Sequence, residues 1–118
     1  MARTRWHIVR EGEALTVARR VPLRWDVSAE TRLPPARRLR VAHQVRQDLW
    51  RMLRRQRGFA PQVRVCPCDD GLQLRAGGRM HGVYDRGAVE GRIADLLADP
   101  DARARWIACA EIRQRSAP

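Results

Sequence analysis

The chain has 118 residues, a net charge of +11 and 44% hydrophobic residues. This length fits one domain over residues 1–118, and the hydrophobic content is sufficient for a core, which argues against a disordered chain. No apolar run approaches the roughly 18 residues that cross a bilayer, and the first residues lack the apolar segment of a secretory signal. We therefore expect a cytoplasmic protein that does not associate with membranes.

The excess of basic charge lies in the N-terminal half. All 24 basic residues are arginine, and residues 1–60 hold 15 of them against 5 acids, whereas residues 61–118 hold 9 against 8. A preference for arginine over lysine does not explain an excess of base over acid. This asymmetry indicates an anionic partner, which is nucleic acid, an acidic protein or, as the less favoured alternative, anionic lipid.

Alternating residues predict a hairpin and then a third strand. Trp6 and Ile8 alternate with polar residues before a turn at residues 11–13, and Leu15 and Val17 do so after it. Residues 22–28 alternate again, with one side formed by Leu23, Trp25 and Val27.

The next segment predicts a long helix from Pro35 to Arg57. Proline in the first turn and Gly58 after the last residue are typical of helix ends. The apolar residues recur at helical spacing and define a stripe that faces the core, formed by Val41, Ala42, Val45, Leu49, Met52 and Leu53.

The second half predicts two short strands at 62–67 and 71–76, a further short strand at Met80–Tyr84, and two helices. The first helix covers 88–98. Asp99 is a suitable N-cap for the second, with Pro100 at its first position and Cys109 on its inner side. The order β-β-β-α-β-β-α-α indicates an α+β fold. We expect a mainly antiparallel sheet of about five strands, packed on one face by the long helix and the two C-terminal helices.

The outer face of the predicted long helix carries almost one sign of charge. Residues 36–57 hold eight arginines and one acid, Asp48. A helical wheel places opposite the core stripe Arg37, Arg40, Gln44, Gln47, Asp48, Arg51 and Arg55. Because solvated helices usually mix both signs, this pattern predicts a surface for phosphate or an acidic partner. The alternative is an ordinary solvated face, and Arg54, Arg55 and Arg57 also have a structural reason to be basic at the carbonyl end of the helix.

The outer face of the predicted sheet is also basic. If the apolar strand residues, with Trp6 and Trp25, face the helices, then the other face carries Arg5, His7, Arg24, Arg64 and Arg75. RNA-binding sheets stack bases on exposed aromatic residues, so two core tryptophans disfavour base stacking and leave contacts with the phosphate backbone. An ordinary solvated face and a homodimer interface are the alternatives.

The metal-ligating pattern of this chain is Cys66-Pro67-Cys68, with His81 or His7 as a further candidate ligand. Structural zinc sites usually pair two such elements, and a second one is missing, so a metal or thiol protein is the less favoured interpretation. We expect no cofactor. Neither a nucleophile elbow nor a phosphate-binding glycine motif occurs, so the sequence predicts a non-enzymatic protein.

These patterns predict a small basic protein that binds the phosphate backbone of nucleic acid. Its main contacts are expected from Arg37, Arg40, Arg51 and Arg55, and its secondary contacts from Arg5, Arg24, Arg64 and Arg75. The alternative is an accessory or adaptor subunit whose basic face docks on an acidic protein.

Overall fold

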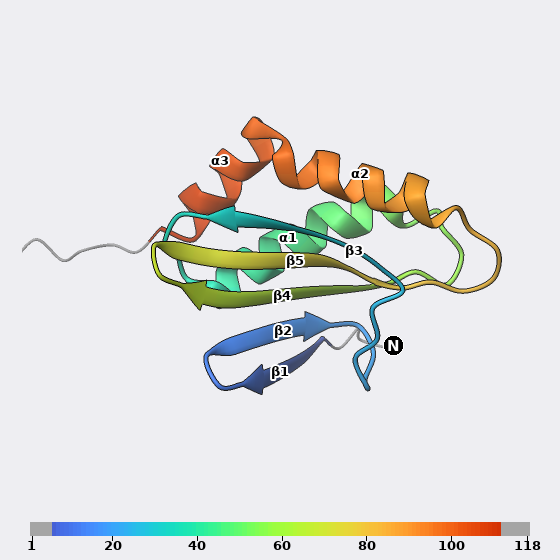
Figure 1. Cartoon of the computed structure of the whole chain (residues 1–118), viewed down its shortest axis with the longest axis horizontal. Helices are drawn as coiled ribbons and strands as arrows, with labels where there is room; N and C mark the ends of the chain where they lie inside the picture. Colours follow the sequence, from blue (N-terminus) through green and yellow to red (C-terminus); the bar gives the residue numbers. More distant parts are fainter. Residues whose placement is uncertain (1–5, 112–118) are drawn as a thin grey trace, which may run out of the picture.

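The computed structural model describes residues 6–111 (Figure 1). The order β-β-β-α-β-β-α-α confirms the predicted α+β fold. The strands are β1 (His7–Glu11), β2 (Ala14–Ala18), β3 (Val27–Leu33), β4 (Ala60–Cys68) and β5 (Gly71–Arg79), and the helices are α1 (Arg38–Leu53), α2 (Arg86–Ala98) and α3 (Pro100–Cys109).

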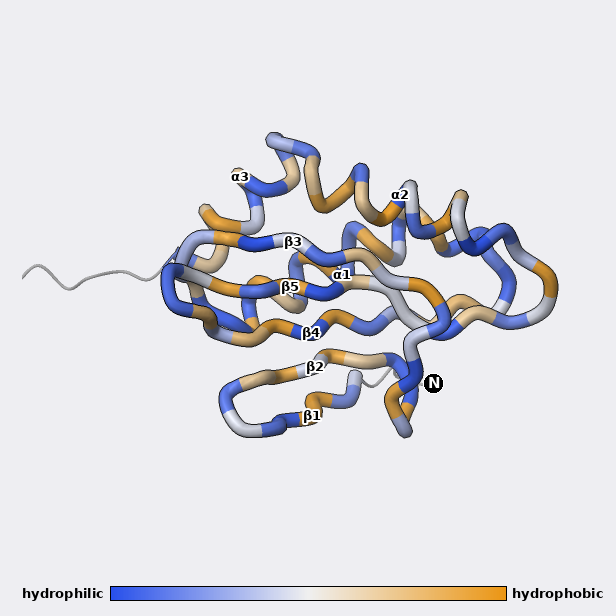
Figure 2. Tube along the Cα trace, viewed as in Figure 1, coloured by the Kyte–Doolittle hydropathy of each residue, from blue (hydrophilic) through white to orange (hydrophobic). Residues whose placement is uncertain are grey.

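The five strands form one antiparallel sheet in the order β1-β2-β4-β5-β3. Cross-strand partners share a face, and one row runs from Val17 through Val63 to Ala76. This row faces the helices, and we call its side the helix face and the other side the open face. Hydrophobic and hydrophilic residues alternate along β4 and β5 in Figure 2, as expected of strands with one buried face.

One hydrophobic core lies between the sheet and the helices and contains residues of every helix and of β2 to β5. The predicted stripe of α1 is confirmed, since Val41, Ala42, Val45, Leu49 and Leu53 are buried and Met52 is partly buried. In Figure 1, α1 lies behind the sheet, whereas α2 and α3 lie along β3.

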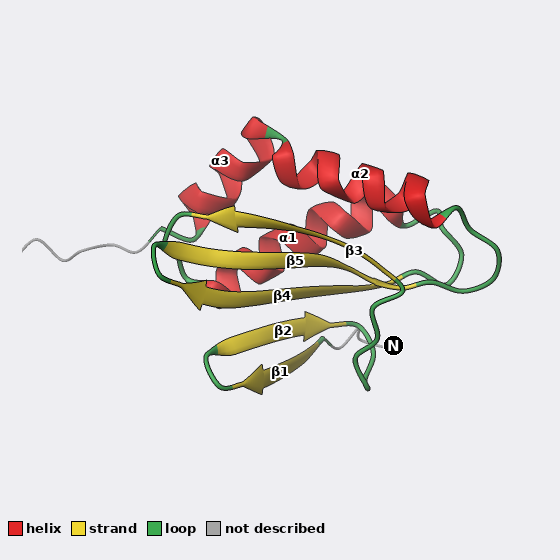
Figure 3. Ribbon diagram, viewed as in Figure 1, coloured by secondary structure: helices red, strands yellow, loops and turns green. Residues whose placement is uncertain are grey.

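The third strand begins later than the sequence predicts. Residues 19–26 form a loop that crosses the ends of β4 and β5, drawn in green in Figure 3. The Arg19 N–H donates to the Pro61 carbonyl (3.1 Å) at one end of the loop, and the Asp26 N–H donates to the Gly78 carbonyl (3.0 Å) at the other. Because β3 lies at the opposite edge from β1, the chain must pass β4 and β5 before it can pair.

The ends of other elements also differ from the prediction. Helix α1 begins at Arg38 rather than at Pro35, because the backbone of Arg37 is extended and its N–H donates to the Ala110 carbonyl (2.8 Å). The helix ends at Leu53, and residues 54–58 form turns. Strand β5 continues to Arg79, so the predicted short strand at Met80–Tyr84 is irregular.

The two C-terminal helices follow the prediction more closely. The Asp99 side chain caps α3 by accepting from the Ala102 N–H, with Pro100 in the first turn. Asp85 caps α2 in the same way through the Ala88 N–H. Cys109, which we expected in the core, is exposed.

The two edges of the sheet differ. Side chains of α2 and α3 cover the outer edge of β3, since the Ser28 N–H donates to the Glu90 carboxylate (2.8 Å) and Arg103 donates to the Arg32 carbonyl. No strand within residues 6–111 pairs with the outer edge of β1. Over the same residues, no helix is both long and apolar enough to span a bilayer.

Candidate functional site

The helical wheel predicted that Asp48, the acid of α1, lies on the outer face of the helix. The structure places it elsewhere. Its carboxylate accepts from Trp106 Nε1 (2.7 Å) and Arg105 Nη1 (2.8 Å), and its side chain is only 10% exposed. Both donors belong to α3. Because α1 packs against α3 as well as the sheet, its solvent face is not diametrically opposite its core stripe, and Asp48 falls in the interface between the two helices.

Among the exposed arginines around the outer side of α1, in the described part of the chain, only Arg51 has an acidic partner. Arg51 Nη1 is 3.9 Å from Asp48 Oδ1, and the Arg51 side chain is 71% exposed. The others are exposed and form no ion pair with any acid in the described part of the chain. We call this set the basic helix surface, which consists of Arg37, Arg40, Arg51, Arg54, Arg55 and Arg57.

The beginning of α1 concentrates positive charge where a helix normally favours acids. Its first turn has no acidic residue, and Arg37 at the N-cap makes no side-chain capping hydrogen bond. A cation near the N-terminal dipole is disfavoured by roughly 0.3–1 kcal/mol. Arg38 has a structural role, because its guanidinium donates to the Glu13 carbonyl. Arg37 and Arg40 show no comparable compensation, and such departures from local preference are expected at functional sites.

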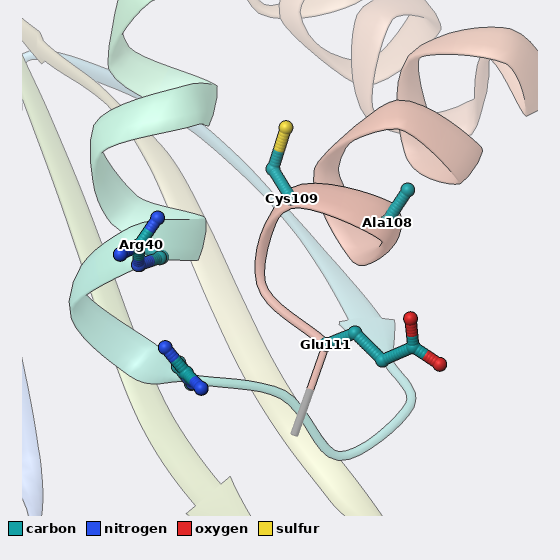
Figure 4. A pocket seen from close by; sticks show the side chains of 5 residues that line it. Arg40, Ala108, Cys109 and Glu111 are labelled. Carbon is teal, nitrogen blue, oxygen red and sulfur yellow. The ribbon is translucent and has the colours of Figure 1, made fainter. Parts of the chain in front are cut away.

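A pocket of about 290 Å³ lies beside this end of α1, lined by Arg37, Arg40, Ala108, Cys109 and Glu111 (Figure 4). The acid among these residues is Glu111, and its carboxylate points away from Arg40 in Figure 4. No ion pair joins them. The first backbone N–H groups of a helix have no intrahelical acceptor, so the two arginines and this helix end favour an anion together.

The predicted arginines of the sheet lie on the open face, away from the basic helix surface. Arg64 and Arg75 are direct cross-strand partners, and Glu30 stands opposite Arg75 on the next strand. Arg75 also donates to Ser28 Oγ (3.2 Å). Since α1 covers the helix face, the structure does not join these residues to Arg37, Arg40, Arg51 and Arg55 in one surface.

Arg24 lies in the crossing loop and is engaged within the fold. Its guanidinium donates to Asp26 Oδ2 (2.7 Å) and to the Met80 carbonyl (3.4 Å). Hydrogen bonds from Arg24 and from the Met80 N–H hold the pKa of Asp26 below its usual value of 3.8. These contacts pin the loop to the end of β5. The remaining predicted residue, Arg5, lies outside the described residues.

The expected position of Trp25 is wrong. This residue is not in the core but in the crossing loop, with the guanidinium carbon of Arg75 4.3 Å from its ring centroid. Arg75 belongs to the open face, so Trp25 covers part of that face. The error follows from the displaced start of β3. Base stacking was disfavoured on the expectation that Trp6 and Trp25 both lie in the core, and Trp25 does not meet that expectation.

A second aromatic and cationic cluster joins the helix face to α1. Trp6 is partly buried, as expected, and the Arg46 guanidinium carbon lies 4.3 Å from its ring centroid. Arg46 Nε also donates to His43 Nδ1 (3.1 Å). Burial, and then the charge of Arg46, lower the pKa of His43 below 6.5, which favours the neutral ring that accepts this bond.

The structure does not bring the candidate metal ligands together. Cys66 and Cys68 lie at the end of β4 next to the turn into β5, whereas His81 follows the opposite end of β5. Among residues 6–111, no group of three or more histidine, cysteine or acidic side chains is placed to hold a metal ion.

Comparisons with protein-family models, with curated proteins and with solved structures gave no match. The functional interpretation of this chain therefore depends on the geometry of its own side chains.

Proposed function

We propose that this chain is a non-enzymatic protein that binds the phosphate backbone of nucleic acid through the basic helix surface. The observation that carries this proposal is the position of Asp48. Asp48, which the helical wheel placed among these arginines, is bound mainly by α3 and keeps only a 3.9 Å contact with Arg51, so the other exposed arginines have no acidic partner in the described part of the chain.

The energetics at the start of α1 support the same proposal. Arg54, Arg55 and Arg57 follow the carbonyl end of the helix, where cations are favourable for the fold itself. Arg37 and Arg40 lie at the other end, where cations are unfavourable. An anionic ligand at this end would reverse that cost, and phosphate groups are common ligands of helix N-termini. A cytoplasmic location, which the sequence predicts, is compatible with such a ligand.

The test is a charge reversal on each face with the same change in net charge. Arg37→Glu with Arg40→Glu alters the basic helix surface, and Arg32→Glu with Arg64→Glu alters the open face. The helix variant should remain folded, because acids at the start of a helix are favourable. The sheet variant places a new carboxylate directly opposite Arg75 on the neighbouring strand, which makes an attractive cross-strand pair.

Binding to a fluorescently labelled 12-nucleotide strand would be measured by anisotropy between 50 and 200 mM salt. The helix variant should bind more weakly, and the slope of log affinity against log salt should fall by about 1.4 for two lost phosphate contacts. The sheet variant should retain most of the affinity. Equal losses in both variants would show dependence on net charge alone. No binding by the unaltered protein at 50 mM salt would leave an acidic protein as the partner.

A further inference from the structure

A pocket of about 290 Å³ lies at the side of α1, next to the end of β2 that carries the crossing loop. It is lined by Trp6, Arg19, Arg46, Trp50 and Pro61. The lining comes from separate parts of the sequence, since Trp6 precedes β1, Arg19 follows β2, and Arg46 and Trp50 are one turn apart on α1. Two indole rings and two guanidinium groups therefore meet around one small space that contains no acidic residue in its lining.

The two tryptophans of this pocket have different surroundings. Trp6 already has two cations over its ring, with guanidinium carbons 4.3 Å (Arg46) and 5.8 Å (Arg19) from the centroid. Arg46 is held further by His43, so its orientation is fixed within the fold. Trp6 thus acts as the support that positions two guanidinium groups at the pocket.

Trp50 is the accessible ring of the pair. It is 43% exposed, and no arginine in the described part of the chain lies over it. On α1 it lies one turn after Arg46 and one turn before Arg54, so it borders the basic helix surface. The core of the protein does not need a tryptophan at this position, because the buried stripe of α1 is complete without it.

We propose that this pocket binds one base of a single-stranded nucleic acid, with the base stacked on Trp50 and its adjacent phosphate held by Arg19 and Arg46. This inference rests on the proposed function, because the same strand would continue along the basic helix surface. Arginine and tryptophan together are the groups that single-strand binding proteins use for phosphates and bases. In a duplex the bases are stacked inside the helix and cannot enter the pocket, so a preference for single strands follows.

Two oligonucleotides of equal length and charge distinguish binding of the base from binding of the phosphate backbone. One is a 12-nucleotide oligothymidine, and the other has abasic sites at its central positions. Both are titrated into the full chain at one salt concentration, with anisotropy and tryptophan fluorescence recorded together. The unaltered protein should bind oligothymidine about tenfold more tightly than the abasic strand, and its tryptophan fluorescence should be quenched.

Trp50→Ala should remove this tenfold difference and most of the quenching, whereas Trp50→Phe should retain part of both. Trp25→Ala is the matched control. It removes an indole of the crossing loop that lies against Arg75 of β5 and does not line this pocket. If Trp50→Ala keeps the tenfold difference in affinity between the two oligonucleotides, the base site is wrong. Equal quenching of the unaltered protein by polyglutamate would also overturn it, because acidic side chains would then be the occupant.

The outcomes also separate this inference from the proposed function. If the unaltered protein binds both strands equally, and Arg37→Glu with Arg40→Glu weakens both, then the base site is wrong and the backbone surface remains. If the tenfold difference is present but the same reversals have no effect, then the basic helix surface is wrong and the pocket remains.

Discussion

Replacing Asp48 with alanine should destabilise the fold much more than its position on a surface helix suggests. The change removes the acceptor of Trp106 Nε1, and Trp106 is 0% exposed, so water cannot replace the lost bond. A buried donor without an acceptor costs about 1–3 kcal/mol. The second donor, Arg105, is about half exposed, and its ion pair adds about 1 kcal/mol or less. We therefore expect Asp48→Ala to lower the free energy of unfolding by about 1–4 kcal/mol.

Asp48→Asn separates the hydrogen bond from the charge. The amide oxygen can still accept from Trp106, so the loss should be about 1 kcal/mol. Urea unfolding is best followed by far-ultraviolet circular dichroism, because the fluorescence of Trp106 itself would change. Asp95→Ala on α2 is the control, since this exposed acid makes no ion pair with a described residue and should change stability by less than about 0.5 kcal/mol.

A double-mutant cycle with Trp106→Phe completes the test. If the Asp48–Trp106 bond carries the effect, the two substitutions should be coupled by about 1–2 kcal/mol. Equal losses for Asp48→Ala and Asp48→Asn, or no coupling with Trp106→Phe, would refute the role assigned to this bond. The position of Asp48 between α1 and α3 would then be incidental to stability.

Two further predictions concern stability. A Cβ at Gly77 would collide with the Val27 carbonyl oxygen, so Gly77→Ala should lower the free energy of unfolding, measured in urea, by about 3 kcal/mol. Gly91 is an exposed position of α2 where a Cβ would meet no atom within 4 Å, so Gly91→Ala should raise the free energy of unfolding by about 0.5–1 kcal/mol. Equal effects of the two substitutions would contradict this packing. The folded chain lowers the pKa of His43 below 6.5, so the unfolded chain takes up the proton first as pH falls, and stability should decline from about pH 7 towards pH 5. His43→Gln should flatten that decline, and an unchanged pH dependence of the urea midpoint would show that His43 does not cause it.

Local patterns in the sequence were sufficient for most of the fold. The alternation on both sides of Asp69-Asp70-Gly71 identifies the β4–β5 hairpin, and Asp99-Pro100 identifies the start of α3. Residues 22–28 misled because alternation also occurs in a loop, and only the strand order shows that this segment crosses the sheet. Strand β3, with the sequence VSAETRL, has only two buried apolar residues, so its own signal is weak.

The candidate site was less predictable than the fold, because it depends on how elements pack together and not on local patterns alone. A helical wheel gives angles around α1 but not which flank another helix will cover. The wheel placed Asp48 among the exposed arginines, whereas α3 covers it. It gave no role to Trp50, whose exposure depends on where the packing of α1 against the sheet ends. The choice of Arg37, Arg40, Arg51 and Arg55 stays a prediction that the binding experiments can test.

The unequal edges of the sheet limit how this chain can assemble. Glu90 and Arg103 occupy backbone groups that a strand docking beside β3 would need. Growth of the sheet from one copy to the next is therefore restricted, in the described part of the chain, to the side of β1. Two copies joined there would present a β3 edge at each end of the shared sheet, and no third copy could be added. Association by strand pairing would thus stop at a closed pair and could not propagate into a fibre.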